Sequence, residues 1–210
     1  MEKIIEDLNW RYAVKAFDDS KKVSSEDLDT IIEAFRLTAS SFGLQPWKLV
    51  VVQDQAVKDS LVEHSWGQGQ IANCSDLLVL ARKNDFSDEN IDEYIASTME
   101  TTWASQEDLQ WYEDMMKGFL GRMDEDKKQV WVNKQIYIAL GNLMTVCANM
   151  RIDSCPVEGF IGPKYDEILG LTEKGLGSVV VLPIGYRAED DKYASNKKVR
   201  FATDEVVVKI

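Results

Sequence analysis

The feature that most constrains the fold is a helical pattern in the middle of the chain that is apolar on most of its sides. Asp124 can cap this helix, and apolar residues then recur at helical spacing as far as about Met150. Trp131, Ile138 and Leu143 extend the apolar character around the cylinder. A helix without a broad polar face must be buried, either centrally in a domain or at a subunit interface. The other elements are therefore expected to pack around it.

Apolar runs at residues 47–53, 77–81 and 177–186 predict three strands, and the C-terminal run 205–210 predicts a fourth. The strands are interleaved with helical patterns but show no regular βαβ rhythm. This arrangement favours an α+β fold with one mixed sheet. No repeat or linker divides the chain, so a single domain is expected over residues 1–210.

Helical patterns fill most of the remaining chain. An amphipathic helix is predicted at residues 1–8, and Ser24 or Ser25 can cap another that ends near Leu37. A short helix is expected at about residues 55–64. Residues 87–120 read as helical but less regular, and they are rich in aromatic residues and methionines. Those side chains fit either ordinary packing or a mobile aromatic arm.

The charge of the chain limits its partners. The net charge is −12, so nucleic acid and anionic membranes are poor partners for the surface as a whole. No apolar run approaches the roughly 18 residues of a membrane span. The N-terminus lacks the basic and apolar regions of a signal peptide, which favours a cytoplasmic location.

The sequence gives little support to metal or hydrolase chemistry. Three scattered cysteines and a single histidine, His64, make structural zinc and a disulfide framework improbable, so buried or semi-buried free thiols are expected. His64 fits a solvent-facing side chain better than a catalytic base. The sequence contains no complete G-x-G-x-x-G fingerprint, phosphate-binding P-loop or G-x-S-x-G elbow. A nicotinamide cofactor, if used, is therefore not expected to be held by a Rossmann unit.

The stretch from Ala39 to Trp47 is the best candidate for a ligand-binding loop. It places two hydroxyls, a glycine, an amide and a proline between a helical pattern and a strand. Small hydrogen-bonding groups on a stiff loop suit the wall of a pocket for a planar polar ligand.

Two basic clusters lie near opposite ends of this acidic chain. Arg11 and Lys15 form the first, and Lys197, Lys198 and Arg200 form the second. Arginine forks match phosphate geometry, so the clusters invite a phosphate-binding hypothesis. Taken by their spacing alone, the clusters fit solvated surface charge better than a phosphate site.

A turn follows the long helix. Pro156 and Gly159 fix it, and such a turn can aim backbone N–H groups at a ligand. A plain connection between a helix and a strand is the alternative.

Taken in order, these pieces resemble the nitroreductase family of FMN-dependent oxidoreductases, in particular its oxygen-insensitive, NfsB-type branch. No single motif is specific, but the ordered set spans nearly the whole chain. The matching segments are Arg11–Asp18, Ser40–Trp47, Trp66–Ile71, Asn133–Asn142, Pro156–Phe160 and Lys198–Arg200.

The resemblance implies a nitroreductase-like fold: a central mixed, mostly antiparallel sheet flanked by helices, in an intertwined homodimer that binds two FMN molecules at the subunit interface. Arg11, Lys15, Lys198 and Arg200 would surround the phosphate and reach toward the ribityl chain. Ser40, Ser41 and Gly43 would come from the opposite subunit. Gln68 or Gln70 would lie at the pyrimidine edge, and Glu158 and Gly159 would offer N–H groups near flavin N5. The cofactor-binding residues implied in full are Arg11, Tyr12, Ala13, Lys15, Ser40, Ser41, Gly43, Gln45, Gln68, Gln70, Gln135, Pro156, Val157, Glu158, Gly159, Lys198 and Arg200.

The activity that the resemblance implies is reduction of quinones, nitroaromatics or similar small electrophilic acceptors by NADH or NADPH, in a ping-pong scheme through one pocket. The flavin carries the hydride, so no side chain is expected to act as a catalytic acid or base, and Lys15 and Glu158 would tune the flavin. Two alternatives stay open: a flavin-binding or redox-sensing protein with little turnover, and a related flavoenzyme with a narrow enone or pterin substrate.

Four positions depart from the family pattern. Tyr12 and Ala13 stand where many relatives have histidine and serine, so one hydroxyl contact to the phosphate is lost. Gly43 stands where asparagine is frequent. Gln70 occupies a place where lysine is found in the NfsB-type branch, which leaves the charge at the pyrimidine edge different.

Overall fold

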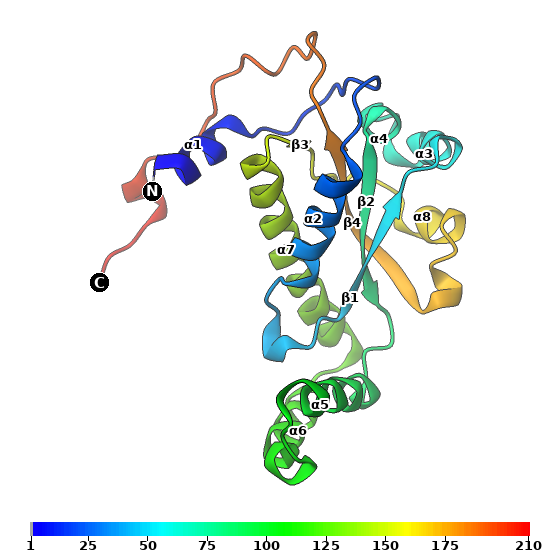
Figure 1. Ribbon diagram of the computed structural model, residues 1–210, viewed down its shortest axis with the longest axis vertical. Helices are drawn as coiled ribbons and strands as arrows, with labels where there is room; N and C mark the ends of the chain where they lie inside the picture. The colour runs from blue at the N-terminus through cyan, green and yellow to red at the C-terminus, as the bar shows by residue number, and fades with distance from the viewer. Residues whose placement is uncertain (1) are drawn as a thin grey trace.

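The long helix is the centre of the fold, as its sequence predicts. A computed structural model describes residues 2–210 (Figure 1). Helix α7 (Glu125–Asn149) begins after Asp124, whose side chain accepts a hydrogen bond from the backbone N–H of Lys127 at 2.9 Å. Ile136, Ala139 and Leu143 are fully buried along it. It packs against the sheet and against helix α2.

Four strands form one antiparallel sheet in the order β1-β2-β4-β3. The strands are β1 (Trp47–Val52), β2 (Asp76–Lys83), β3 (Asp153–Ser154) and β4 (Leu176–Gly185). The predicted mixed sheet was wrong for these strands, and the one parallel pairing among residues 2–210 is an isolated bridge between Ala13 and Ser154. The reason lies in the connections. Val52 pairs with Leu77, so the segment between β1 and β2 returns at the end of the sheet where it left.

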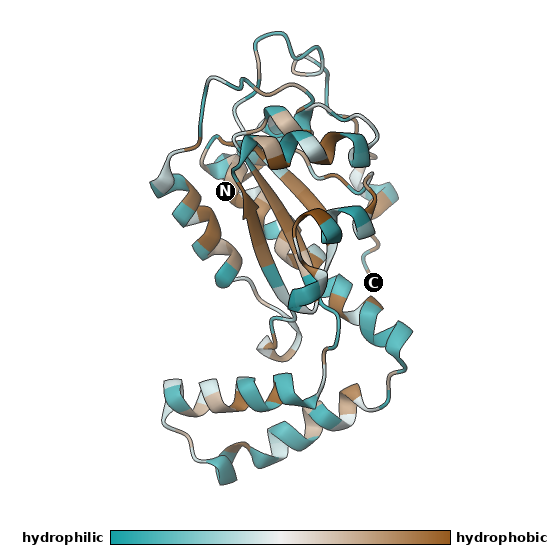
Figure 2. Ribbon diagram, turned by 90° about the vertical axis from the view of Figure 1, so that its right-hand side faces the viewer, coloured by the Kyte–Doolittle hydropathy of each residue, from teal (hydrophilic) through white to brown (hydrophobic). Residues whose placement is uncertain are grey.

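Alternate side chains of the strands feed two hydrophobic cores, one on each face of the sheet. Leu78 and Leu80 of β2 point into the core beneath α2 and α7, whereas Leu77 and Val79 point into the core beneath α3, α4 and α8. Figure 1 shows these two groups of helices on opposite sides of the sheet, and Figure 2 shows how apolar the strands are compared with the helices around them. The flanking helices are α2 (Ser25–Arg36), α3 (Gln55–Val62), α4 (Gln70–Asn73) and α8 (Gly162–Ile168).

The aromatic segment forms a helical hairpin that stands apart from the sheet (Figure 2). It consists of α5 (Asp88–Thr102) and α6 (Gln106–Leu120), which pack on each other. The break between them falls at Trp103, whose φ of 62° is left-handed and whose side chain is 90% exposed. Ser105 then caps α6. The irregularity predicted for this segment is therefore one sharp turn between two regular helices.

The two ends of the described chain lie outside the sheet. Helix α1 (Glu2–Trp10) confirms the amphipathic pattern over the described residues, and Met1 of that pattern lies outside them. The predicted C-terminal strand was wrong: α9 (Thr203–Val206) is followed by residues that pair with no described strand. After β4 the chain leaves the sheet (Figure 1), so its β-branched tail has no edge to join. The short 3₁₀ helices are η1 (Ser41–Gly43), η2 (Glu63–Ser65) and η3 (Thr172–Lys174).

The three cysteines are buried, whereas His64 keeps part of its side chain exposed. Cys74, Cys147 and Cys155 are free and buried, as the sequence predicts. His64 is half-buried, beside the carboxylate of Glu63 at 3.4 Å. Residues 2–210 contain no group of three acidic, histidine or cysteine side chains arranged to hold a metal ion. Within the same residues, no helix has the length and apolarity needed to cross a membrane.

Candidate functional site

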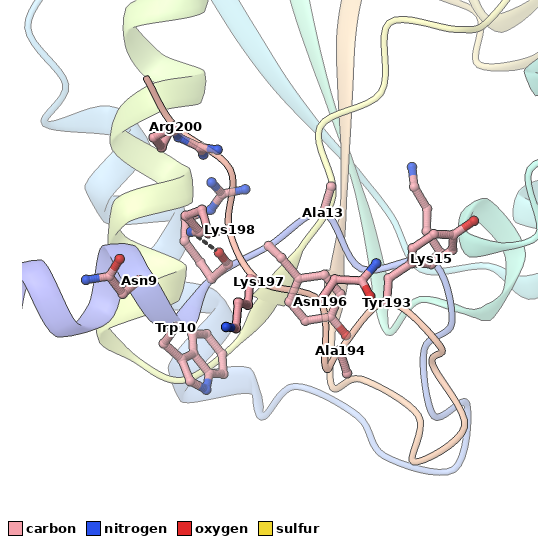
Figure 3. Close-up of a pocket in the computed structure, with 12 residues that line it drawn as sticks. Asn9, Trp10, Ala13, Lys15, Tyr193, Ala194, Asn196, Lys197, Lys198 and Arg200 are labelled. Atoms are coloured by element: carbon pink, nitrogen blue, oxygen red, sulfur yellow. Dashed lines mark hydrogen bonds between the residues drawn. The ribbon is translucent and has the colours of Figure 1, made fainter. Parts of the chain in front are cut away.

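The two basic clusters of the sequence meet in one cavity. One wall is the extended segment after α1, and the other is the segment after β4 that carries the second cluster (Figure 3). The cavity has a volume of about 410 Å³. Its lining residues are Asn9, Trp10, Arg11, Tyr12, Ala13, Lys15, Tyr193, Ala194, Asn196, Lys197, Lys198 and Arg200.

This cavity carries positive charge that no lining carboxylate balances. Its basic residues are Arg11, Lys15, Lys197, Lys198 and Arg200, and none of them forms an ion pair with any of residues 2–210. Burial and the nearby charge of Arg200 lower the pKa of Arg11. Burial and the charges of Arg11 and Arg200 likewise lower the pKa of Lys198. Like charges gathered in a chain of net charge −12 form a local site for an anion.

Arg11 provides a specific reason to expect a phosphate there. Its Nε atom is buried and donates no hydrogen bond to any described group. A buried N–H group without a partner costs free energy, and a phosphate oxygen can accept its hydrogen bond. The residues present therefore fit a phosphate group.

Lys198 contributes charge while its hydrogen atoms are mostly used within the chain. Its ammonium donates to the backbone oxygens of Leu8 and Arg11 at the C-terminal end of α1. A helix C-terminus favours a cation, so this contact fixes the ammonium beside the cavity. One of its three N–H donors is left for a ligand.

Tyr12 and Ala13 line the same cavity, but neither offers a free hydroxyl. The Tyr12 hydroxyl donates to Oδ2 of Asp191 at 3.0 Å. Ala13 instead forms the isolated bridge to Ser154. Their part in the site is to shape its wall.

Lys15 points away from the end of the cavity that holds Lys198 and Arg200 (Figure 3). Its Nζ lies 3.5 Å from Sγ of Cys155, which is fully buried. Burial raises the pKa of this thiol against the opposing charge of Lys15, so the thiol is neutral at pH 7. Cys155 immediately precedes Pro156, and Lys15 therefore stands where the cavity approaches the predicted Pro156–Gly159 turn.

Two glutamines connect this region to the turn. Gln70 Nε2 donates to Gln68 Oε1 at 2.9 Å, and Gln68 Nε2 donates to the Gly159 carbonyl oxygen at 2.9 Å. Gln70 is buried. The two glutamines therefore hold the turn through the Gly159 carbonyl oxygen. The Gly159 N–H takes no part in these bonds.

Within the turn, the predicted residues differ in what they can offer. The Val157 N–H donates to the Val181 carbonyl at 2.9 Å, and its own carbonyl accepts from Val181 at 3.1 Å. Its backbone is therefore committed to β4. Pro156 has no N–H group to donate. Glu158 and Gly159 are the residues of this turn that can present an N–H to a ligand.

Glu158 is exposed and accepts a short hydrogen bond from the Tyr137 hydroxyl of α7. Partial burial and this carboxylate raise the pKa of Tyr137 to about 12. The contact ties the turn to the central helix.

Trp66 lies beside the turn, and the sequence analysis gave it no role beyond the start of a matching segment. Its side chain is 76% exposed, and its φ of 55° is left-handed. The ring lies against Gly159, because a Cβ added there would stand 2.6 Å from an indole carbon. A side chain at residue 159 would therefore displace this ring. The available signal was its place at the start of the Trp66–Ile71 segment, one of those that carry the family resemblance.

The Ser40–Trp47 loop is not part of the basic cavity within one subunit. Trp47 pairs with Arg82 at one end of the sheet, whereas Asp76 pairs with Ile184 at the end where the basic segments lie (Figure 1). The structure thus places this predicted wall and the predicted phosphate site at opposite ends of the sheet.

The loop is nevertheless held rigidly. The Ser41 N–H donates to Gln135 Oε1 of α7 at 2.8 Å, and the Gln45 N–H donates to Ser40 Oγ at 3.0 Å. Gln45 also donates its side-chain amide to the Arg36 carbonyl at 2.7 Å. Gln135 and Gln45 therefore support the loop from inside this chain.

Comparison with known proteins identifies the family of this chain. The family model described as "Nitroreductase family" matches residues 8–186. A Staphylococcus aureus protein named "Putative NAD(P)H nitroreductase" is 37% identical over 220 residues, covering 98% of this chain and 95% of the relative.

Two solved structures share the fold. The structure of ydfN from Bacillus subtilis superposes with a TM-score of 0.89 at 20% identity and full coverage of both chains. A structure from Exiguobacterium sibiricum in complex with FMN gives a TM-score of 0.85 at 19% identity, with 99% of this chain and 97% of the other covered. On the match over residues 8–186 and the identity to the Staphylococcus relative, this chain belongs to the nitroreductase family.

Proposed function

We propose that this protein is an FMN-dependent NAD(P)H oxidoreductase that reduces quinones, nitroaromatics or similar small electrophilic acceptors. The observation that carries the proposal is the cavity of uncompensated basic residues around the buried, unpartnered Nε of Arg11. A Staphylococcus relative named for NAD(P)H and a structural neighbour holding FMN support the same choice of cofactor and donor. The cytoplasm is its proposed location, and residues 1–210 its single domain.

The residues of the cavity would hold the phosphate. Arg11 and Arg200 offer guanidinium donors, and Lys198 adds charge and one N–H. At the other end, Lys15 would lie near the pyrimidine side of the ring, where negative charge gathers on reduction. A fixed ammonium there favours the reduced form of a flavin.

When bound, FMN would supply the hydride chemistry. The protein would orient the flavin and its partners and set the electrostatic field around the ring. The turn at Glu158 and Gly159 offers backbone N–H groups, and the Gln68–Gln70 pair offers amides at its flank. Trp66 provides an exposed aromatic surface beside this turn for a flat donor or acceptor ring. One pocket serving donor and acceptor in turn requires no separate dinucleotide domain, in keeping with a sequence that contains no complete Rossmann fingerprint.

We further propose that the protein is a homodimer in which Ser40, Ser41 and Gly43 face the flavin bound by the other subunit. The separation of the loop from the basic cavity within one chain supports this proposal. Exposed apolar side chains support it, because a free surface rarely leaves so many uncovered. Those of α1 and the C-terminal segment are Ile4, Ile5, Leu8, Val199, Phe201, Val206, Val208 and Ile210.

The decisive experiment is an absorbance spectrum of the purified protein with and without NADH or NADPH under nitrogen. A bound flavin whose visible bands bleach with the donor and return when menadione or nitrofurazone is added is the expected result. A protein that neither contains nor binds FMN overturns the proposal. A bound flavin that the donors cannot reduce favours a redox-sensing role, and re-oxidation by enones or pterins alone favours a narrow acceptor.

The dimer is tested separately by light scattering after size-exclusion chromatography. The expected mass is about twice the 23.9 kDa of one chain. A monomer that binds FMN stoichiometrically would contradict the shared site.

A further inference from the structure

Asp191 is a buried carboxylate that joins the two basic segments. Its side chain is 5% exposed. Oδ2 accepts from the Tyr12 hydroxyl at 3.0 Å, the Lys15 N–H at 2.9 Å and the Ala16 N–H at 3.2 Å. Oδ1 accepts from the Tyr193 N–H at 2.9 Å. One side chain therefore satisfies donors from two segments far apart in the sequence.

The position of these bonds matters for the cavity. Lys15 is itself a lining residue, and the Tyr193 N–H belongs to the segment that continues to Lys198 and Arg200. Asp191 thus fastens the wall that carries Arg11 to the wall that carries Arg200. The Ala188 N–H also joins the two segments by donating to the Ala16 carbonyl at 2.9 Å, but this bond lies before Asp191 in the chain. Beyond Asp191, toward Arg200, the contact of Lys198 with the end of α1 joins the second segment to the first.

Tyr12 is held from its other side as well. The guanidinium of Arg187 lies 4.6 Å from the Tyr12 ring centroid and pairs with both carboxylate oxygens of Asp153. The phenol is therefore fixed in the orientation that reaches Asp191.

We propose that Asp191 is a positioning residue for the phosphate-binding site, which sets the spacing between the cations of the two segments. The inference rests on the proposed function, since it assumes that the cavity binds the FMN phosphate. Asp191 need not touch the flavin to act in this way.

An amide cannot replace the carboxylate. All four partners of Asp191 are donors, and an asparagine presents only one acceptor oxygen beside an NH₂ group. Burial opposes ionisation, but the N–H groups of Tyr193, Lys15 and Ala16 outweigh it and hold the pKa of Asp191 below its ordinary value. The residue is ionised at pH 7, so it adds a negative charge near an anion site.

Because Asp191 is charged, the sign of the change in FMN affinity on its replacement tells two explanations apart. By Coulomb's law alone, removal of a carboxylate near a phosphate site strengthens FMN binding. Loss of the correct spacing between the cations weakens it. The two effects have opposite signs, so the measured direction separates them.

The experiment compares Asp191→Asn with Asp190→Asn by titration of the flavin-free proteins with FMN and with riboflavin, which lacks the phosphate. Asp190 is the exposed neighbour, and its substitution makes the same change in net charge. We expect Asp191→Asn to weaken FMN binding about tenfold or more, as loss of well-placed charge-assisted bonds implies. Its riboflavin affinity should stay within about twofold of the wild type, and Asp190→Asn should change neither affinity beyond that, since an exposed charge is screened.

Unchanged or tighter FMN binding in Asp191→Asn overturns the inference, and so does an equal loss of FMN and riboflavin binding. A wild-type protein that binds neither flavin overturns the proposed function and this inference with it. If Asp191→Asn does not fold, Tyr12→Phe carries the test, because it removes one of the four bonds and leaves the carboxylate in place. FMN binding weakened about two- to fivefold, with riboflavin unchanged, supports the inference. Unchanged FMN binding in Tyr12→Phe then overturns it.

Discussion

The ring of Tyr94 occupies the space where a side chain at residue 43 would stand. A Cβ added at Gly43 would lie 2.9 Å from the Tyr94 hydroxyl oxygen and 3.2 Å from the nearest ring carbon. Gly43 also has a φ of +77°, which favours glycine. The left-handed backbone and the nearby Tyr94 ring therefore both favour glycine at this position.

Gly43→Ala is expected to destabilise the protein for both reasons. The left-handed conformation costs roughly 1–2 kcal/mol for a residue with a Cβ. The contact with Tyr94 adds about 1–3 kcal/mol of overpacking. Urea unfolding measures the sum.

Gly175→Ala is the matched control, because Gly175 has a similar φ of +66° but no atom within 4 Å of an added Cβ. Gly175→Ala should show the conformational cost alone. Equal destabilisation by the two substitutions would mean that Tyr94 yields without cost.

Arg200→Ala is expected to weaken FMN binding by removing charge-assisted hydrogen bonds to the phosphate, worth on the order of 1.5–3 kcal/mol. Fluorescence titration with FMN measures the change. Lys192→Ala removes an equal charge from the same segment outside the cavity and should leave the affinity nearly unchanged. If both variants weaken FMN binding equally, Arg200 acts only through the net charge of the segment and not through hydrogen bonds to the phosphate.

Lys15→Gln is expected to lower the reduction potential of the bound flavin. The ammonium favours the more negative, reduced form, and its loss should shift the potential down by roughly 30 mV or more, since 30 mV corresponds to about 1.4 kcal/mol for two electrons. Spectroelectrochemical titration gives the value. Gln70 is buried beside Gln68 in the same region. Gln70→Lys adds a positive charge there and should raise the reduction potential of the flavin.

Lys21→Gln serves as the control for Lys15→Gln, because Lys21 pairs with Asp18 away from the cavity. A potential that moves equally in both variants would show that Lys15 acts only through net charge.

The Tyr137–Glu158 contact predicts a dependence of stability on alkaline pH. The pKa of Tyr137 is raised to about 12 by burial and by Glu158, against an ordinary value of 10.0. The folded state therefore retains a proton that the unfolded state releases, and the stability from this residue is lost as the pH rises from about 10 to 12.

Tyr137→Phe should thus lose less stability than the wild type between about pH 10 and pH 12, as measured by urea unfolding at several pH values. Glu158→Gln should bring the ionisation of Tyr137 to lower pH in a tyrosinate absorbance titration. If the pKa of Tyr137 is the same in Glu158→Gln as in the wild type, burial alone raises it.

Local patterns in the sequence predicted the main elements well. Asp124 begins α7 and Ser24 begins α2, because each side chain accepts from the N–H three residues on and needs no distant partner. Strands β1, β2 and β4 lie within about two residues of the apolar runs that predicted them. The run at residues 205–210 failed because strand formation depends on a neighbouring edge, which its composition cannot supply.

Periodicity and residue type act over a few neighbouring positions, so the sequence alone predicted the buried runs of α7, β1, β2 and β4 and located the two basic clusters. The tertiary structure decided the strand order, the meeting of Arg11 with Arg200 and the contact of Tyr94 with Gly43. It also decided that Asp191 binds the two basic segments together, and that the Ser40 loop lies at the other end of the sheet from them. These relationships join residues far apart in the chain. They depend on how the two faces of the sheet pack, and no spacing in the sequence encodes them.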